Sequence, residues 1–162
     1  KGLLNFKGVQ RRFNKVFTYN GIEFYDDYAH HPTEIKVVLE GVNKVYQNFD
    51  KVCIFQPHRI SRLKDLRKEF SYAFKDADTV ILCPIYTAGE KIKLGFNYLK
   101  FAKEIIKNSK VNLFLVENNN QLAKFLKKNM YGKKIVIGMG AGSISNWMRN
   151  LPQMMIKWKL KN

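Results

Sequence analysis

The sequence predicts an α/β domain with a mostly parallel sheet of about six strands, helices on both faces and an antiparallel hairpin at its start. Short apolar runs that suit buried strands alternate with longer segments in which apolar residues recur at helical spacing. Ahead of this alternation, Asn20-Gly21 separates two β-prone runs, which is a strong signal for a tight hairpin turn. This arrangement is typical of three-layer, Rossmann-like domains.

The hairpin is expected at residues 16–19 and 22–25. Pro32 then suits the first turn of a helix, where its missing N–H costs nothing. Apolar residues at helical spacing continue from there as far as Phe49. The later strands, each short and apolar, are expected at residues 51–56, 79–83, 112–116 and 134–138.

Helices are expected in the intervals between these strands. Ser61 can cap the start of the second helix, and a loop over residues 84–95 precedes the third. The polar residues 117–120 can cap the fourth helix. The last helix follows residues 140–143, and Pro152 is expected to end it.

The chain is strongly basic. Its 162 residues fit one domain, and Lys and Arg total 29 against 13 Asp and Glu, a formal net charge of +16. A nucleic-acid-binding module is therefore one alternative. The lysines, however, are spread along every helix, whereas four of the six arginines fall in two short segments, which favours local recognition of an anion.

No apolar run approaches the roughly 18 residues of a membrane span, so no membrane insertion is expected. Cys53 and Cys83 each lie inside an apolar, strand-like run, which is typical of reduced core thiols in a cytoplasmic protein. Neither cysteine stands at metal-ligand spacing and the adjacent histidines diverge, so no metal site is predicted.

Polar turns follow four of the expected strands. They read DDYAHHPTE (residues 26–34), QPHRISR (56–62), IYTAGE (85–90) and GAGS (140–143). Because ligands of parallel sheets bind at the carboxyl ends of strands, these turns are expected to share one edge. The first two are predicted to lie side by side and to form one wall of a composite site.

The first turn carries acids and imidazoles. Asp27 ends a strand, where a carboxylate can accept hydrogen bonds from a ribose diol or can cap the amides of the turn. His30 and His31 can act as ligands, acid–base groups or phosphate donors. Glu34 falls in the first turn of the expected helix, where a carboxylate is favourable for structure alone.

Arginines mark the other ligand candidates. Arg59 and Arg62 can reach one anion, helped by the partial positive charge of the helix start, although surface ion pairs are the alternative. Arg11 and Arg12 point to opposite sides of an extended chain, so one of them is expected to contact a ligand. The turn at residues 140–143 allows close backbone approach, but it is not a full G-x-G-x-x-G, and the sequence contains no G-x-x-x-x-G-K-[ST] phosphate loop.

The order GVQRRF, DDYAHHPTEI, FQPHRISR, IYTAGE and GAGSIS resembles the C-terminal domain of the Mur ligases, over residues 8–151. The resemblance implies a three-domain enzyme whose central ATPase domain holds the phosphates and most magnesium ligands. Residues 1–7 would be the linker from that domain, and residues 152–162 a C-terminal tail. The implied partners are the N-terminal and central domains of the same polypeptide, and this fragment alone is expected to be inactive.

The resemblance also implies the reaction. ATP and Mg²⁺ activate a carboxylate as an acyl phosphate, which the amino group of an incoming amino acid attacks. The PHR sequence in the second turn favours the branch of the family that joins L-alanine to UDP-N-acetylmuramate. A branch that attaches a ready-made tripeptide to the same sugar nucleotide is the alternative.

Individual residues receive roles from the same resemblance. The implied ATP-binding residues are Arg11 or Arg12 at the phosphates, Asp27 at the ribose, and His30. The implied catalytic residues, which face the muramoyl carboxylate and the alanine, are His58, Arg59 and Arg62. The implied substrate-binding residues are Tyr28, His31, Gly140, Ala141, Gly142 and Ser143. Many relatives carry Asp where Ser143 stands.

Overall fold

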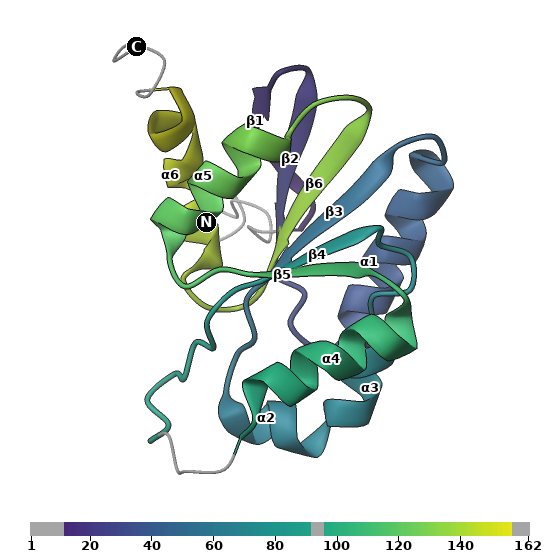
Figure 1. Cartoon of the computed structure of the whole chain (residues 1–162), viewed down its shortest axis with the longest axis vertical. Helices are drawn as coiled ribbons and strands as arrows, with labels where there is room; N and C mark the ends of the chain where they lie inside the picture. The colour runs from purple at the N-terminus through teal and green to yellow at the C-terminus, as the bar shows by residue number, and fades with distance from the viewer. Residues whose placement is uncertain (1–11, 92–95, 157–162) are drawn as a thin grey trace, which may run out of the picture.

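The computed structural model describes residues 12–91 and 96–156, which form a six-stranded mixed sheet flanked by helices (Figure 1). The strand order is β1-β2-β6-β3-β4-β5, with β1 antiparallel to β2 and every other neighbouring pair parallel. The strands are β1 (Asn14–Tyr19), β2 (Ile22–Asp27), β3 (Asp50–Phe55), β4 (Thr79–Leu82), β5 (Asn112–Leu115) and β6 (Lys134–Met139). The predicted fold class is confirmed.

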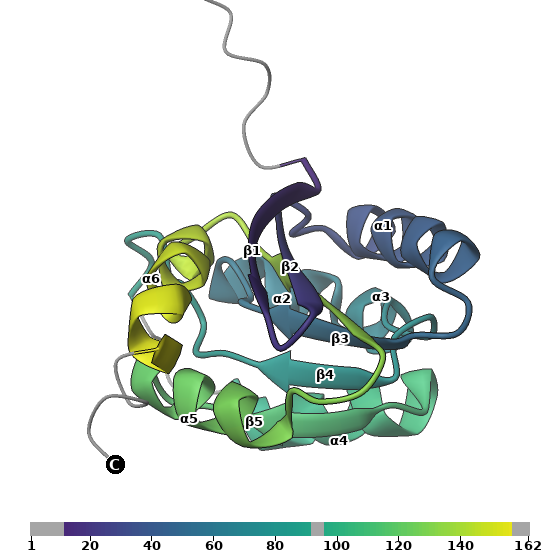
Figure 2. The same ribbon diagram turned by 90° about the horizontal axis from the view of Figure 1, so that it is seen from above.

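Helices cover both faces of the sheet. They are α1 (Pro32–Val45), α2 (Ile60–Asp65), α3 (Arg67–Tyr72), α4 (Tyr98–Ser109), α5 (Asn119–Asn129) and α6 (Ile144–Ile156). One buried cluster joins the sheet to α1, α2, α3 and α4, and a second joins its other face to α5 and α6. Figure 2 shows α1 and α6 on opposite sides of the β1–β2 hairpin.

The hairpin turn has the predicted conformation. Asn20 and Gly21 have positive φ angles of 51° and 76°, as a type I′ turn requires. The second strand of the hairpin continues to Asp27, two residues further than predicted from the β-prone run that ends at Tyr25. The strand therefore delivers Asp27 directly into the first polar turn.

Several helix boundaries differ from the sequence prediction, and the second expected helix is divided into α2 and α3. α2 begins at Ile60 instead of after a Ser61 cap, because the Ser61 hydroxyl donates to the distant Glu90. α1 ends at Val45, so Phe49 lies in the connection to β3. Its ring still packs against Tyr46, at 5.4 Å between centroids, and this packing explains the helical spacing of Phe49.

The last helix runs further than predicted. α6 continues through Pro152 to Ile156, although proline lacks the N–H that would bond to the preceding turn. Leu151 and Met155 are fully buried, so packing favours a helix that continues past the proline. Residues 157–162 and the predicted linker at residues 1–7 lie outside the described part of the chain.

The parallel strands end level with one another. Asp27 pairs with Met139, Met139 pairs with Phe55, and Phe55 pairs with Leu82. The four polar turns follow these strand ends, so the predicted shared edge is confirmed. No helix in the described ranges is long and apolar enough to cross a membrane.

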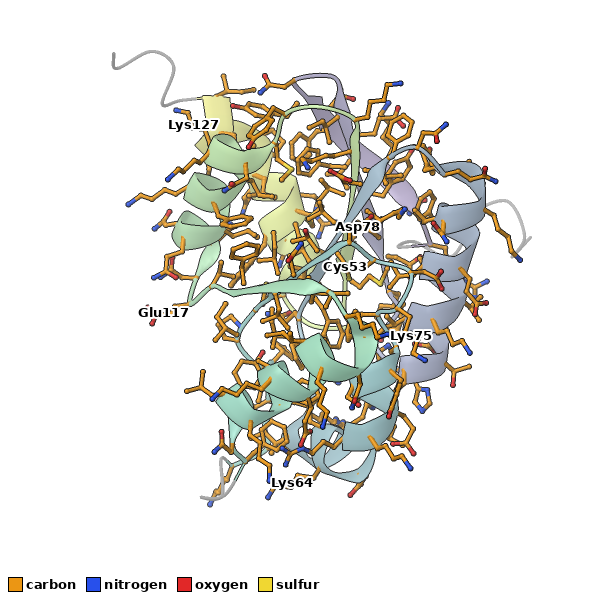
Figure 3. All side chains as sticks on the ribbon, turned by 45° about the vertical axis from the view of Figure 1, so that its right-hand side comes forward. Cys53, Lys64, Lys75, Asp78, Glu117 and Lys127 are labelled. Atoms are coloured by element: carbon orange, nitrogen blue, oxygen red, sulfur yellow. The ribbon has the colours of Figure 1, made fainter. Side chains whose placement is uncertain are left out.

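Charge and sulfur are distributed as the sequence suggested. Lys64, Lys75 and Lys127 lie at distant parts of the surface (Figure 3). Both cysteines are buried free thiols, which confirms that part of the prediction. Burial raises the pKa of Cys53, and it raises the pKa of Cys83 to about 12, so neither thiol is reactive at neutral pH.

Candidate active site

A buried carboxylate holds the turn after β2. Asp27 is 7% exposed, and its two oxygens each accept a hydrogen bond of 2.8 Å, from the amides of Ala29 and Phe13. The structure thus supports the amide-capping alternative for Asp27, which also fixes the chain that enters β1. A ribose contact by Asp27 stays a prediction.

The same turn caps α1 through two side chains. His31 occupies the N-cap, where its Nδ1 accepts from the Thr33 amide at 3.3 Å. Glu34 accepts from the amides of His30 and His31, both at 3.0 Å. Burial alone would raise the pKa of Glu34, but these amide hydrogen bonds and the nearby imidazoles outweigh it and lower the pKa. The structural interpretation of Glu34 is confirmed.

His30 is oriented by its own turn. Its Nδ1 lies 2.9 Å from the Tyr28 carbonyl oxygen and 3.4 Å from Glu34 Oε2. Because both neighbours are acceptors, we assign a proton to Nδ1, which leaves Nε2 as the ring nitrogen that could contact a ligand. The Tyr28 ring packs edge-on against the imidazole at 4.9 Å between centroids.

The turn after β3 is tied to the loop after β4. Arg59 donates its amide to the Tyr86 carbonyl at 2.8 Å, and Tyr86 donates its own amide to the Pro57 carbonyl, also at 2.8 Å. These bonds extend the pairing of β3 and β4 beyond their regular ends. Arg59 has a φ of 69°, a left-handed conformation that a non-glycine residue keeps only when its surroundings hold it.

His58 is held between Arg62 and Tyr86. Arg62 Nη1 donates to His58 Nδ1 at 3.1 Å, and the imidazole stacks on the Tyr86 ring at 5.6 Å between centroids. Burial lowers the pKa of His58, and the positive charge of Arg62 lowers it further, with smaller effects from His30 and Arg59. His58 is therefore neutral near pH 7 with its proton on Nε2, which makes it a donor to an anion and not a base.

Four rings cross this edge in a row. Tyr28, His30, His58 and Tyr86 follow one another at centroid distances of 4.9, 5.8 and 5.6 Å. The first pair comes from the turn after β2 and the next ring from the turn after β3, although β6 lies between those strands. The prediction that the two turns meet is confirmed, because their side chains come together past the end of β6.

Gln56 joins the end of β3 to the turn after β6. It is 3% exposed, donates to Ser143 Oγ and accepts from the Ile144 amide, both at 2.9 Å. One side chain therefore fixes the glycine-containing turn and satisfies an amide at the start of α6. The Ser143 hydroxyl is engaged in this internal contact.

Two glycines of that turn are required by close packing. A Cβ on Gly140 would lie 2.7 Å from the Gln56 carbonyl oxygen. A Cβ on Gly142 would lie 2.7 Å from both Gln56 Oε1 and Tyr86 Cβ. The close approach predicted for this turn is therefore an approach to the protein itself. Substrate contacts by Gly140, Ala141, Gly142 and Ser143 stay predictions.

Sequence reasoning did not single out Gln56 or Glu90. Glu90 accepts from the Ile60 amide at 2.8 Å, from the Ser61 amide at 3.2 Å and from the Ser61 hydroxyl. It thus occupies the amides at the start of α2 that the sequence suggested for a bound anion, which corrects that detail. The available signal was position, since Gln56 opens the second polar turn and Glu90 closes the third.

An open groove of about 460 Å³ lies beside the first turn. It is lined by Arg12, Phe13, Asp27, Tyr28, Ala29, Thr33, Glu34, Val37 and Val38. The lining combines one cation with two aromatic rings and the carboxylates of Asp27 and Glu34. Arg12 is exposed at this groove, whereas Arg11 lies outside the described residues.

We also searched the described residues for a group that could hold a metal ion. Within residues 12–91 and 96–156, no group of three or more His, Cys, Asp or Glu side chains is placed to hold a metal ion. The cations and donor groups of the wall suit the anionic part of a ligand.

The fold defines an α/β domain of the doubly wound class, and the wall lies at the carboxyl edge of the parallel sheet, where such domains bind their ligands. The chain belongs to the Mur ligase family, because the family model described as "Mur ligase, glutamate ligase domain" matches residues 11–142. The resemblance drawn from the polar turns is confirmed.

Two curated relatives cover almost the whole chain. The UDP-N-acetylmuramate–L-alanine ligase of Pelagibacter ubique is 71% identical over 154 residues, which are 95% of this chain and 33% of that protein. The ligase of the same name from Caulobacter vibrioides is 40% identical, over 94% of this chain and 32% of that protein. The chain thus spans about a third of the length of the curated relatives it matches.

Solved structures show the same fold. A UDP-N-acetylmuramate-alanine ligase from Thermotoga maritima matches with a TM-score of 0.71 and 27% identity, over 97% of this chain and 32% of that one. A murein peptide ligase from Psychrobacter arcticus matches with a TM-score of 0.72 and 19% identity, over 94% and 31%. A domain from a putative ligase of Haemophilus ducreyi, 17% identical with a TM-score of 0.65, is covered over 99% of its length by 89% of this chain.

Proposed function

We propose that this chain is the C-terminal domain of an ATP-dependent ligase that joins L-alanine to UDP-N-acetylmuramate. The observation that carries the proposal is the 71% identity to a ligase of that name along 95% of the chain. The N-terminal and central domains would be supplied by the same polypeptide. The reaction would belong to peptidoglycan precursor synthesis in the cytoplasm.

The second turn would hold the carboxyl groups of the reaction. ATP with Mg²⁺ supplies the phosphoryl group that activates the muramoyl carboxylate. Arg59 and Arg62 would pair with the alanine carboxylate and with the negative charge that grows as the amino group attacks. His58 would add a neutral Nε2–H donor, because Arg62 already occupies its Nδ1. We therefore assign His58 to charge stabilisation and not to proton abstraction.

The groove beside the first turn would take the nucleotide. Asp27 already accepts two amide hydrogen bonds, so a ribose hydroxyl would meet a carboxylate that is held in one orientation. His30 would lie at the border with the substrate, since its ring faces His58. Arg11 or Arg12 would reach the phosphates. Because the sequence lacks a phosphate loop, tight nucleotide binding would require the central domain.

The other predicted substrate residues would act mainly by shape. Tyr28 is 47% exposed and could contact a ligand directly. His31 and Ser143 already serve as hydrogen-bond partners inside the protein. We propose that His31 and residues 140–143 form the surface of the cleft and that their backbone position matters more than their side-chain chemistry.

The tripeptide-adding branch is the rival within the family. The fold does not separate the two branches, because the murein peptide ligase and the alanine ligase structures match with TM-scores of 0.72 and 0.71. The sequence does favour alanine, with 71% and 40% identity to two alanine ligases. Nucleic acid and membrane are not among the partners we propose, and a gel shift that persists at physiological salt would contradict this.

Domain replacement tests the proposal. In a hybrid ligase, this chain replaces the matching third of the Pelagibacter ubique ligase. Phosphate release from ATP is then measured. We expect release only when UDP-N-acetylmuramate and L-alanine are both present. The matched control is the same hybrid ligase with Arg59→Ala and Arg62→Ala, which should be inactive. A folded hybrid ligase that releases no phosphate under any of these conditions would contradict the proposal.

A further inference from the structure

The start of α2 is held by a side chain 30 positions away in the sequence. α2 lacks a side-chain cap of its own, since Arg59 at the N-cap position makes no capping hydrogen bond. Glu90 fills that role from the loop after β4, by accepting from both the Ile60 and Ser61 amides and from the Ser61 hydroxyl. The carboxylate therefore fixes the backbone that follows Arg59.

The same loop also holds the backbone before α2. Tyr86 accepts from the Arg59 amide and donates to the Pro57 carbonyl. The loop after β4 thus holds this turn on both sides of Arg59. Tyr86 bonds to the backbone of Pro57 and Arg59, and Glu90 bonds to that of Ile60 and Ser61. Between these anchors Arg59 keeps its left-handed φ of 69°. A strained residue of this kind relaxes when one of the contacts that hold it is lost.

The loop has a defined shape that directs Glu90 back to α2. Ala88 and Gly89 have positive φ angles of 51° and 84°, and the Glu90 amide donates to the Thr87 carbonyl at 3.0 Å. Hydrogen bonds from Ser61 lower the pKa of Glu90, and the bond from its hydroxyl has a larger effect than the bond from its amide. The carboxylate is consequently ionised throughout the neutral range and can act as a permanent acceptor.

We propose that Glu90 is a positioning residue for Arg59 and Arg62, which fixes the left-handed turn so that both guanidinium groups can meet one carboxylate or phosphate. Glu90 acts through the backbone of Ile60 and Ser61, and it does not touch the substrate. The effect on turnover rests on the proposed function. The effect on the turn itself can be measured on this chain alone.

The first test is hydrogen exchange by NMR on this chain. Glu90→Gln keeps the shape of the side chain but removes its charge, and Glu90→Ala removes both. The matched controls are Glu40→Gln and Glu40→Ala, on the outer face of α1, where Glu40 contacts Lys36 at 3.8 Å. We expect exchange of the Ile60 and Ser61 amides to accelerate about tenfold or more in Glu90→Ala, less in Glu90→Gln, and not at all in the controls.

The same samples report on the charge at the site. Arg62, His30 and Arg59 lower the pKa of His58 while Glu90 raises it, so Glu90→Gln should lower the His58 pKa further. Glu40→Gln should leave it unchanged. Glu90→Gln is expected to keep the fold even if Glu90→Ala does not. Exchange at Ile60 and Ser61 that stays at the parent rate in a folded Glu90→Gln chain, with no change in the His58 pKa, would overturn the proposal.

The second test is a double-mutant cycle in the hybrid ligase. Glu90→Ala should lower kcat about 10- to 100-fold with a smaller change in the KM for L-alanine, because the arginines are displaced and not removed. In an Arg59→Ala background the same change should cost less, because only Arg62 is left to be displaced. Equal costs in both backgrounds would show that Glu90 does not act through Arg59. An inactive parent hybrid would instead count against the proposed function, and the NMR test would still decide the role of Glu90.

Discussion

The turns after β2 and β3 carry similar side chains but differ in how far away their main hydrogen-bond partners lie. In the turn after β2, Glu34 accepts from the amides of His30 and His31, and Asp27 accepts from Ala29 and, 14 residues away, from Phe13. In the turn after β3, the decisive contacts come from Glu90, 30 residues away, and through Gln56 from Ser143, 87 residues away. The start of α1 is capped by residues of the first turn itself, whereas the start of α2 is capped by a distant segment of the sheet edge.

The two turns also differ in what they would offer a ligand. Asp27 and Glu34 of the first turn already accept from amides, so that turn would offer a ligand mainly its shape and the rings of Tyr28 and His30. The second turn keeps Arg59 exposed and leaves the Nε2 of His58 as a donor. We therefore expect anion recognition to be concentrated where the local backbone is strained and held by distant segments.

The largest expected effect is the loss of turnover when an arginine of the turn after β3 is removed. In the hybrid ligase, Arg62→Ala should lower kcat about 10²- to 10³-fold, since it removes a guanidinium from developing negative charge and frees His58 Nδ1. Phosphate release measures the loss. Arg149→Ala, which removes an exposed arginine bonded to Asn146, should have no effect. If His31→Ala costs as much as Arg62→Ala, the distinction between the turns fails.

The next effect tests the long-range contacts of the edge. Gln56→Ala should lower the free energy of unfolding by about 1–3 kcal/mol, because the buried Ile144 amide and the Ser143 hydroxyl lose their partner. Urea unfolding of this chain measures the change. Gln47→Ala is the matched control, since Gln47 makes one exposed hydrogen bond to the Lys44 carbonyl. Equal stability of the two variants would mean that Gln56 does not hold the edge.

A pair of glycine substitutions sharpens the same point. Gly142→Ala should destabilise the chain by about 1–3 kcal/mol, because its methyl group would collide with Gln56 and Tyr86. Gly41→Ala, inside α1 with nothing within 4 Å of the added Cβ, should stabilise it by about 0.5–1 kcal/mol. Thermal unfolding measures whether each substitution raises or lowers the stability. A stabilising Gly142→Ala would show that the turn after β6 is not packed as described.

The smallest effect concerns the turn after β2. The folded-state pKa of Glu34 is lowered, so its ionised form adds stability above the unfolded value of about 4.3, and this is lost as the pH falls through the folded pKa. Its side chain is 50% exposed, so Glu34→Gln should cost less than about 1 kcal/mol at pH 7.

Urea unfolding at two pH values checks the sign. The stability difference between the parent chain and Glu34→Gln should shrink between pH 7 and about pH 3. Glu40→Gln serves as the control, because Glu40 contacts only the neighbouring Lys36 among the ion pairs described. A difference that grows on acidification would contradict the capping role of Glu34.

The fold was predictable where local rules decide it. Asn20-Gly21 gives the hairpin turn and Pro32 begins α1, since both signals act within a few residues. The position of β6 between β2 and β3 was not predicted, because strand order depends on packing between distant segments. Pro152 misled for the same reason, as burial of the flanking residues outweighs the lost hydrogen bond.

In the candidate site, too, the features set by local sequence were predictable and those set by packing were not. The polar turns could be found from sequence because each follows a strand, and their meeting followed from the parallel sheet. Ser61 was wrongly expected to cap α2, because the competing acceptor is Glu90, which sequence spacing cannot bring to Ile60. The roles of Gln56 and Glu90 emerge only when the turns are packed together.

The most direct test of the account is the identity of the product. The hybrid ligase is given ATP, Mg²⁺ and UDP-N-acetylmuramate with equal amounts of L-alanine and of the tripeptide L-alanyl-γ-D-glutamyl-meso-diaminopimelate, and the products are identified by mass spectrometry. We expect UDP-N-acetylmuramoyl-L-alanine as the main product, and its loss when Arg59 and Arg62 are replaced by alanine. A main product that carries the tripeptide, or alanine addition that persists without both arginines, would contradict it.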